Sequence, residues 1–213
     1  MDANINSIVK ELKKVPIEQV VFEAITNSIQ ANARNIKIYF NALNQSTDEE
    51  SYQSINEIKV IDNGEGFNDS NVKSFDTYRS DYKQKLGAKG VGRFLYLKLF
   101  DKVDIYSLSN EIKFTVKGVE VKKLETSYPE TELLLSSPKD TYQIDISDFE
   151  QKVKNHFLPY FKLLMDQNKS VKITIYFNEN ELREINSKDI PNFKTDNFDI
   201  EKRGCKTFRV NRR

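Results

Sequence analysis

The sequence predicts an α+β protein in which a mixed, mostly antiparallel sheet forms one layer and helices covering one face of that sheet form the other. Two periodicities alternate along the 213 residues. Apolar residues recur at helical spacing in the segments 5–14, 16–33, 91–100 and 148–166. Strand-like patterns occupy the segments 35–40, 57–61, 104–108, 111–116, 120–124, 132–135 and 171–177. The close succession of runs between 104 and 135 favours antiparallel pairing, and the last helix and strand predict a C-terminal extension.

The first three elements have the clearest local signals. Ile5, Ile8 and Leu12 fall on one face of a short helix. Pro16 suits the first turn of a second helix, because the backbone N–H that proline lacks would have no partner there. In the segment NIKIYF (35–40) every second residue is apolar, as expected for a strand with one buried face.

Three segments lack a clear period. Residues 41–56 are polar and predict a loop. Residues 68–88 are rich in Ser, Asp, Lys and Tyr, and a segment of that length predicts a lid or a binding loop. The tail, 178–213, is weakly patterned. Because the character of the sequence changes after Pro138, we expect one domain over residues 1–140 and a C-terminal α/β extension over 141–213.

Composition narrows the classes of function. Lys and Arg total 33 and Asp and Glu total 32, a formal net charge of +1, which argues against a general polyanion binder but permits a local basic patch. Cys205 is the single cysteine, so an internal disulfide is excluded and a reducing compartment is favoured. The sequence lacks a signal-peptide pattern and any run of roughly 18 apolar residues that would span a membrane. We therefore expect a cytoplasmic protein with no membrane partner.

The single histidine, His156, limits the catalytic mechanisms. A multi-histidine metal site cannot form from this chain, and a Ser-His-Asp triad would need this one residue. His156 lies in the amphipathic segment KVKNHFLPYF, where we interpret it as a surface or half-buried helix residue.

The segment FEAITNSIQANA (22–33) places three polar side chains on one stripe of the second helix. Glu23, Asn27 and Gln30 stand at i, i+4 and i+7, whereas the apolar residues line another face. The side-chain oxygen of Asn27 is a ligand that Mg²⁺ accepts while it keeps several waters. Glu23 can take a proton from a water held near such a cation and a phosphate. The same stripe also fits a solvated face of an amphipathic helix.

A glycine turn follows the strand predicted over 57–61. In IDNGEGF (61–67), Asp62 ends the strand, and Gly64 and Gly66 follow it as Gly-x-Gly. A carboxylate at a strand end can accept a hydrogen bond from an exocyclic amine such as that of adenine, and glycines let the backbone approach a flat ring. An ordinary Asx turn, stabilised by Asn63, explains the same residues.

A glycine-rich loop precedes the helix predicted over 91–100. In GAKGVGRF (87–94) the glycines permit backbone N–H groups to converge on an anion at a helix N-terminus, beside the charges of Lys89 and Arg93. No Gly-Lys-Ser/Thr ending is present, which excludes a Walker A loop. The loop follows a polar segment rather than a strand, unlike a dinucleotide fingerprint. A flexible hinge is the other interpretation.

In this order and spacing, the three segments resemble the motifs of the GHKL ATPases, the superfamily of gyrase B subunits, heat-shock chaperone ATPases, histidine kinases and MutL proteins. Glu23-x-x-x-Asn27 resembles the N box, Asp62-x-Gly64-x-Gly66 the adenine-binding motif, and residues 87–92 the glycine-rich lid motif. The resemblance covers residues 1–140 and implies the two-layer α/β sandwich of that superfamily. It also implies Mg²⁺-dependent ATP binding and hydrolysis, with lid closure driving a conformational change or dimerisation.

The resemblance implies roles for individual residues. Glu23 would be the general base and Asn27 the Mg²⁺ ligand. Contacts to the base would come from Asp62, Gly64, Gly66 and Thr131. Contacts to the phosphates would come from Lys89, Gly90, Val91, Gly92 and Arg93. The match at Thr131 departs from the family pattern, because Glu130 replaces the glycine that usually precedes that threonine.

Two further departures bear on turnover. Gln30 stands where the family often has an acidic residue, and no lysine after Ile144 matches the one that the gyrase and MutL branches carry on a transducer domain. The histidine-kinase branch does not fit, because no phosphoacceptor helix precedes the domain, and Glu23 favours hydrolysis over phosphotransfer. We expect an ATPase that is slow in isolation. We also expect the N-terminal fragment of a larger bacterial-type protein, an ATP-dependent homodimer in which 141–213 begins a transducer-like domain.

Two other functions stay open at this point. An ATP-sensing scaffold with little turnover fits Gln30 and the unmatched lysine. A nucleic-acid-binding module fits the interleaved aromatic and Lys residues in 157–162, although a net charge near zero disfavours it for this chain alone. Strand passage, DNA compaction, repair and antiviral defence against phage all use GHKL modules, and a fold does not choose among them.

Overall fold

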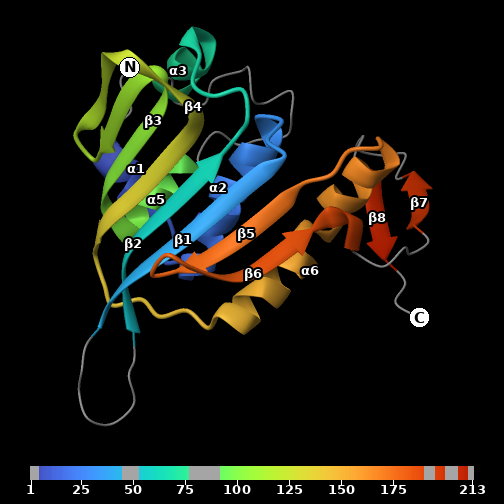
Figure 1. The fold of residues 1–213 in the computed structure, drawn as a ribbon. Coiled ribbons are helices and arrows are strands. Elements are labelled where there is room, and N and C mark those ends of the chain that lie inside the picture. Colours follow the sequence, from blue (N-terminus) through green and yellow to red (C-terminus); the bar gives the residue numbers. More distant parts are fainter. Residues whose placement is uncertain (1–4, 45–52, 77–91, 190–194, 200–205, 211–213) are drawn as a thin grey trace.

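A six-stranded sheet forms one layer of the molecule, with the strand order β3-β4-β2-β1-β5-β6 (Figure 1). The computed structural model describes residues 5–44, 53–76, 92–189, 195–199 and 206–210. The β1–β5 pair is parallel and the other pairs are antiparallel. The strands of this sheet are β1 (Asn35–Asn44), β2 (Gln53–Asp62), β3 (Phe100–Thr115), β4 (Gly118–Pro138), β5 (Lys172–Phe177) and β6 (Asn180–Asn186). A two-stranded sheet pairs β7 (Thr195–Asp199) with β8 (Lys206–Val210).

Helices cover one face of the six-stranded sheet (Figure 1). Ile38 of β1 lies opposite Val60 of β2, both are buried, and the register continues to Leu133 of β4 on the same face. On the other face, Tyr39 stacks on Tyr176 with ring centroids 4.4 Å apart. The covering helices are α1 (Ile5–Glu11), α2 (Ile17–Gln30), α5 (Arg93–Leu99) and α6 (Ile146–Asp166). This arrangement confirms the predicted α+β class with a mostly antiparallel sheet covered on one face.

Local signals set the ends of the predicted helices. Helix α2 begins directly after Pro16. It ends three residues earlier than predicted, because Asn32 takes a left-handed conformation (φ 61°) and its N–H donates to Ile29 O. The N–H of Ala33 then donates to Ser28 O at 3.0 Å, which completes a Schellman motif. Helix α6 is capped by Asp145, whose Oδ1 accepts from Asp148 N at 3.0 Å.

The prediction of four strands between 104 and 135 is wrong in number, because the structure has two strands there. Strands β3 and β4 build one long hairpin that bulges near Leu108, where φ is 52°. A bulge interrupts the alternation of buried and exposed residues without ending the pairing. For the same reason the loop predicted over 41–56 is too long: pairing of β1 with β2 continues past a bulge at Asn41 to Asn44 and Gln53.

The prediction of a loop throughout 68–88 is wrong for α3 (Asp69–Asp76). Asn68 caps this helix, since its Oδ1 accepts from Ser70 N at 3.1 Å and Asn71 N at 3.0 Å. Phe75 anchors it by packing edge-on against Phe67, with centroids 5.5 Å apart. Residues 77–88 lie outside the described ranges, so the prediction of a lid there stays a prediction.

The C-terminal helix and strand form as predicted. The strand joins the main sheet, and the helix packs against it. Strand β5 pairs with β1 from Asn35 to Phe40, and Phe149 of α6 packs edge-on against Phe40 at 5.2 Å. The sheet is therefore continuous across the domain boundary predicted at residue 140, and that division into two domains stays a prediction. The weakly patterned tail contributes β6, the 3₁₀ turn η1 (Ser187–Asp189), β7 and β8.

Candidate functional site

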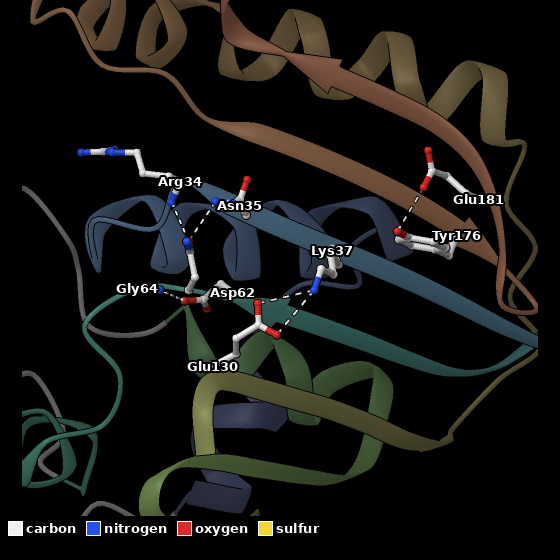
Figure 2. Close-up of polar contacts among 9 residues, drawn as sticks. Arg34, Asn35, Lys37, Asp62, Gly64, Glu130, Tyr176 and Glu181 are labelled. Atoms are coloured by element: carbon white, nitrogen blue, oxygen red, sulfur yellow. Dashed lines mark hydrogen bonds and ion pairs between the residues drawn. The ribbon is translucent and has the colours of Figure 1, made fainter. Parts of the chain in front are cut away.

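Asp62, the last residue of β2, carries a buried carboxylate on the helix-covered side of the sheet. The residue is 8% exposed. Oδ2 accepts a hydrogen bond from Ser28 Oγ of α2 at 2.8 Å. Oδ1 accepts one from Gly64 N, also at 2.8 Å (Figure 2). Burial raises the pKa of the Asp62 carboxyl above its ordinary value, although both hydrogen bonds lower it. The carboxylate keeps lone pairs that can accept a further hydrogen bond from a ligand amine.

The turn after Asp62 is fastened to the neighbouring elements. The bond from Gly64 N is the Asx turn that the sequence allows. Asn63 Oδ1 accepts from the backbone N–H groups of Arg34 (2.8 Å) and Asn35 (2.9 Å), which join the turn to the start of β1 (Figure 2). Glu65 N donates to Ala31 O at the end of α2, also at 2.8 Å. The turn is thus held from two sides, and Asn63 stabilises it as its position predicts.

Two buried hydroxyl groups lie beneath the second glycine of this turn. Gly66 has a φ of +72°, and a Cβ at this position would lie 2.7 Å from Ser107 Oγ. Ser107 Oγ accepts from Phe67 N at 2.9 Å and hydrogen-bonds Thr131 Oγ1 at 2.7 Å. Thr131 is paired with Asp62 across the β2–β4 register. The structure therefore places Thr131 on the strand next to Asp62, and its contact with a base stays a prediction.

Glu23 and Asn27 lie one turn apart on α2 and are in direct contact. Asn27 Nδ2 donates to Glu23 Oε1 at 3.3 Å and to the hydroxyl of Tyr96, on α5, at 3.0 Å. Both hydrogens of the amide group are thereby directed into the protein, which leaves Oδ1 as the acceptor atom of the side chain. Burial, and next the charge of Glu23, raise the pKa of Tyr96 well above its ordinary value, so its hydroxyl stays protonated.

Gly92, the last glycine of the glycine-rich segment, lies against the Glu23 carboxylate. A Cβ placed on Gly92 would overlap the carboxylate group of Glu23. The backbone of Gly92 is itself helical (φ −57°, ψ −41°), so space rather than conformation requires glycine here. Two of the three predicted segments therefore meet at one point, where α2 faces the start of α5.

The resemblance implies ATP hydrolysis, and we expect Gly92→Ala to lower the rate of that reaction by roughly 10- to 100-fold, because the new methyl group displaces the carboxylate from its position. The fold should be retained, since alanine is favourable at a helical φ and ψ. Phosphate release and thermal unfolding of the purified chain measure the two effects. When Glu23 is replaced by alanine, the methyl group at position 92 has space. Adding Gly92→Ala to the Glu23→Ala variant should therefore leave its Tm unchanged. A lower Tm of the double variant would show that the methyl group clashes with a residue other than Glu23.

Among the remaining residues predicted near the phosphates, the structure describes only Arg93. The guanidinium of Arg93 lies over the rings of Phe75 and Phe94, 5.1 and 4.9 Å from their centroids, so it packs on aromatic side chains. Lys89, Gly90 and Val91 lie outside the described residues. Contacts of these four residues with phosphates stay predictions.

Three side chains at this site were not predicted. Ser28 and Ser107 are buried hydroxyls, and Tyr96 is a buried phenol that reaches Asn27. Ser28 carried a usable signal, since it stands four residues after Ala24 on the apolar face of α2, where an unpartnered hydroxyl would be costly. Nothing in the local sequence distinguishes Ser107 or Tyr96 from other residues of a strand or helix.

Two other sequence interpretations can be compared with the structure. His156 is exposed on α6 and stacks on Phe22 with centroids 4.4 Å apart, as expected for a surface helix residue. Phe157 and Phe161 are fully buried, so these two members of the pattern that suggested nucleic-acid binding are core residues.

Among the described residues, no helix is both long and apolar enough to cross a membrane. The same part of the chain contains no group of three or more His, Cys, Asp or Glu side chains placed to hold a metal ion. A magnesium ion shared with phosphates does not need such a group, because it keeps waters and takes one or two protein ligands.

The sequence model of a family described as "Histidine kinase-, DNA gyrase B-, and HSP90-like ATPase" matches residues 15–154, more than half of the chain. The protein therefore belongs to this family of GHKL ATPases, as the three segments indicate. Membership supports ATP binding at the level of the family. Among curated proteins, none matches the chain.

Solved structures similar to this chain include a MutL ATPase domain and a domain of a DNA repair protein. The MutL ATPase domain of Aquifex aeolicus, complexed with ADP, is 16% identical with a TM-score of 0.47, and the alignment covers 82% of this chain and 64% of that one. The N-terminal domain of a DNA repair protein is 15% identical with a TM-score of 0.44, over 85% of this chain and 56% of that one. The chain thus spans less than two thirds of the length of either.

Proposed function

We propose that this protein binds ATP together with Mg²⁺ and hydrolyses it. The observation that carries the proposal is the contact between Gly92 and the Glu23 carboxylate. This contact brings the candidate base to the end of the glycine-rich segment, where family members hold phosphates. At the other end of the site, Asp62 of β2 accepts a hydrogen bond from Ser28, which stands five residues after Glu23 on α2. Glu23 and Ser28 are therefore separated by about 7.5 Å along the helix axis.

Each residue has a distinct task in this proposal. Asp62 accepts a hydrogen bond from the amine of adenine, while Gly64 and Gly66 let the backbone lie against the ring. Asn27 offers Oδ1 to Mg²⁺, a hard cation that suits a single amide oxygen beside phosphate oxygens and waters. Glu23 takes the proton of the attacking water.

Titration calorimetry and a phosphate-release assay test the proposal on the full 213-residue chain. We expect a nonhydrolysable ATP analogue to bind in the presence of Mg²⁺ and phosphate to be released slowly from ATP. Absence of binding would contradict the whole proposal. Binding without turnover would favour an ATP-sensing scaffold, the second candidate, which is motivated by the amide of Gln30 where the family often has an acidic residue and by the unmatched lysine.

Two further parts of the proposal concern motion and assembly. We infer from family membership that nucleotide binding closes residues 68–89 over the site and favours a homodimer. Sedimentation velocity with and without the analogue measures the second part. A mass that stays that of one chain at saturating nucleotide would contradict nucleotide-driven dimerisation of this chain.

A further inference from the structure

Tyr96 is a buried side chain that contacts Asn27, the candidate magnesium ligand, although it belongs to none of the three sequence segments. It lies in the middle of α5, is 3% exposed, and its hydroxyl oxygen accepts a hydrogen bond from Asn27 Nδ2 at 3.0 Å. The two residues are 69 positions apart. Packing of α5 on α2 brings them together.

The orientation of the Asn27 amide decides what it presents to a cation. An amide has an oxygen, which binds Mg²⁺, and an NH₂ group, which repels it, and the two differ by a half-turn of the terminal torsion. In this structure Nδ2 donates to Glu23 Oε1 at 3.3 Å and to Tyr96 Oη at 3.0 Å. The shorter of the two bonds is the one to the tyrosine.

Glu23 alone is a weak constraint on this orientation. Its bond to Asn27 is long, and the proposed function requires Glu23 to bind a water and to change protonation during each turnover. The Tyr96 hydroxyl takes no part in that proton transfer, and a phenol is neutral near pH 7. As a neutral hydroxyl it can accept from Nδ2 throughout the cycle.

We propose that Tyr96 is a positioning residue that locks the Asn27 amide with Oδ1 facing the magnesium ion of the bound nucleotide. The inference rests on the proposed function, since it assigns a partner to the ligand named there. It extends the site to α5, which carries Gly92 at its start. The same short helix therefore places the glycine against Glu23 and the phenol against Asn27.

The test is the magnesium dependence of nucleotide binding by the Tyr96→Phe variant of the full chain. Binding of a nonhydrolysable ATP analogue is followed while Mg²⁺ is titrated at a fixed nucleotide concentration. We expect the magnesium concentration at half-maximal binding to rise at least about tenfold, the usual effect of losing the partner that orients a metal ligand. Binding at saturating Mg²⁺ should recover, because the adenine contact is untouched.

Tyr176→Phe is the matched control, because it removes the hydroxyl of a half-buried tyrosine on β5 that donates to Glu181 on β6 (Figure 2). Its magnesium midpoint should equal that of the unmodified chain. A second comparison uses Asn27→Asp, whose carboxylate offers an oxygen in either orientation. In that background, adding Tyr96→Phe should shift the midpoint by less than about twofold, since no amide is left to orient.

The outcomes separate the inference from the proposed function. If the unmodified chain binds no nucleotide at any magnesium concentration, both are overturned. If it binds and Tyr96→Phe has the same magnesium midpoint, only the role of Tyr96 is overturned. A variant that stays unbound at saturating Mg²⁺, or an equal shift in the Asn27→Asp background, would likewise assign Tyr96 to general packing.

Discussion

Glu23→Gln should abolish most ATP hydrolysis while leaving ATP binding within about twofold of the unmodified chain. General-base catalysis contributes roughly 10²- to 10⁴-fold to a rate, and the amide of glutamine cannot accept the proton of the water. Glutamine has the size of glutamate and its oxygen can still accept from Asn27 Nδ2, so the local structure should persist. Single-turnover phosphate release gives the rate, and calorimetry with a nonhydrolysable analogue gives the affinity.

Glu18→Gln is the matched control for this change. Glu18 lies in the first turn of the same helix, and its carboxylate accepts from Lys152 Nζ at 2.6 Å, away from Gly92. Hydrolysis by this variant should stay within about twofold of the unmodified rate. Equal loss in both variants would indicate damage to α2 rather than removal of a base, and full turnover by Glu23→Gln would exclude Glu23 from proton transfer.

Asp62→Asn should weaken ATP binding by roughly 10- to 100-fold. This factor corresponds to the loss of a hydrogen bond to a charged group, which contributes about 1.5–3 kcal/mol. The amide oxygen is fixed toward Gly64, since an NH₂ group there would face the Gly64 N–H. The NH₂ group therefore takes the place of Oδ2 beside Ser28, whose hydroxyl can turn to accept from it. An adenine amine would then meet a donor, and calorimetry measures the loss.

The same variant should keep or raise the stability of the fold, and the effect should depend on pH. Because the pKa of Asp62 is raised in the folded state, ionisation of this group opposes folding. That destabilisation is absent below the unfolded pKa, grows as the pH rises toward the folded pKa, and is complete above it. At pH 7 the Tm of Asp62→Asn should therefore equal or exceed that of the unmodified chain. A lower Tm would show that the Asp62 carboxylate stabilises the fold.

Asp101→Asn is the control for both measurements on Asp62. Asp101 is an exposed carboxylate on β3 that pairs with Lys139 at 3.4 Å. Exposed pairs contribute about 0–1 kcal/mol, so neither ATP affinity nor stability should change appreciably. A loss of affinity in this variant as large as that in Asp62→Asn would indicate a general effect of charge.

The fold could be predicted wherever local periodicity and caps agree. These signals are local, because each depends on residues close together in the sequence. They are the apolar spacing of α2 and α6, the proline at position 16 before α2, and the alternation of apolar residues in β1 and β5. The errors occurred where a bulge or a long-range contact overrides the local pattern. The bulge at Leu108 hides the continuity of β3, and α3 depends on Phe75 meeting Phe67, which polar composition does not indicate.

By itself the sequence determined the chemistry that is available to this protein. It identified the carboxylates Glu23 and Asp62, the amide of Asn27 and the glycines, because the functional groups and their spacing along one helix or turn are local properties. Only the tertiary structure decided which of these groups meet. Ser28 reaches Asp62 across 34 positions and Tyr96 reaches Asn27 across 69. Such contacts exist because burying the apolar faces of α2 and α5 on one sheet fixes their relative position, and no local pattern encodes that position.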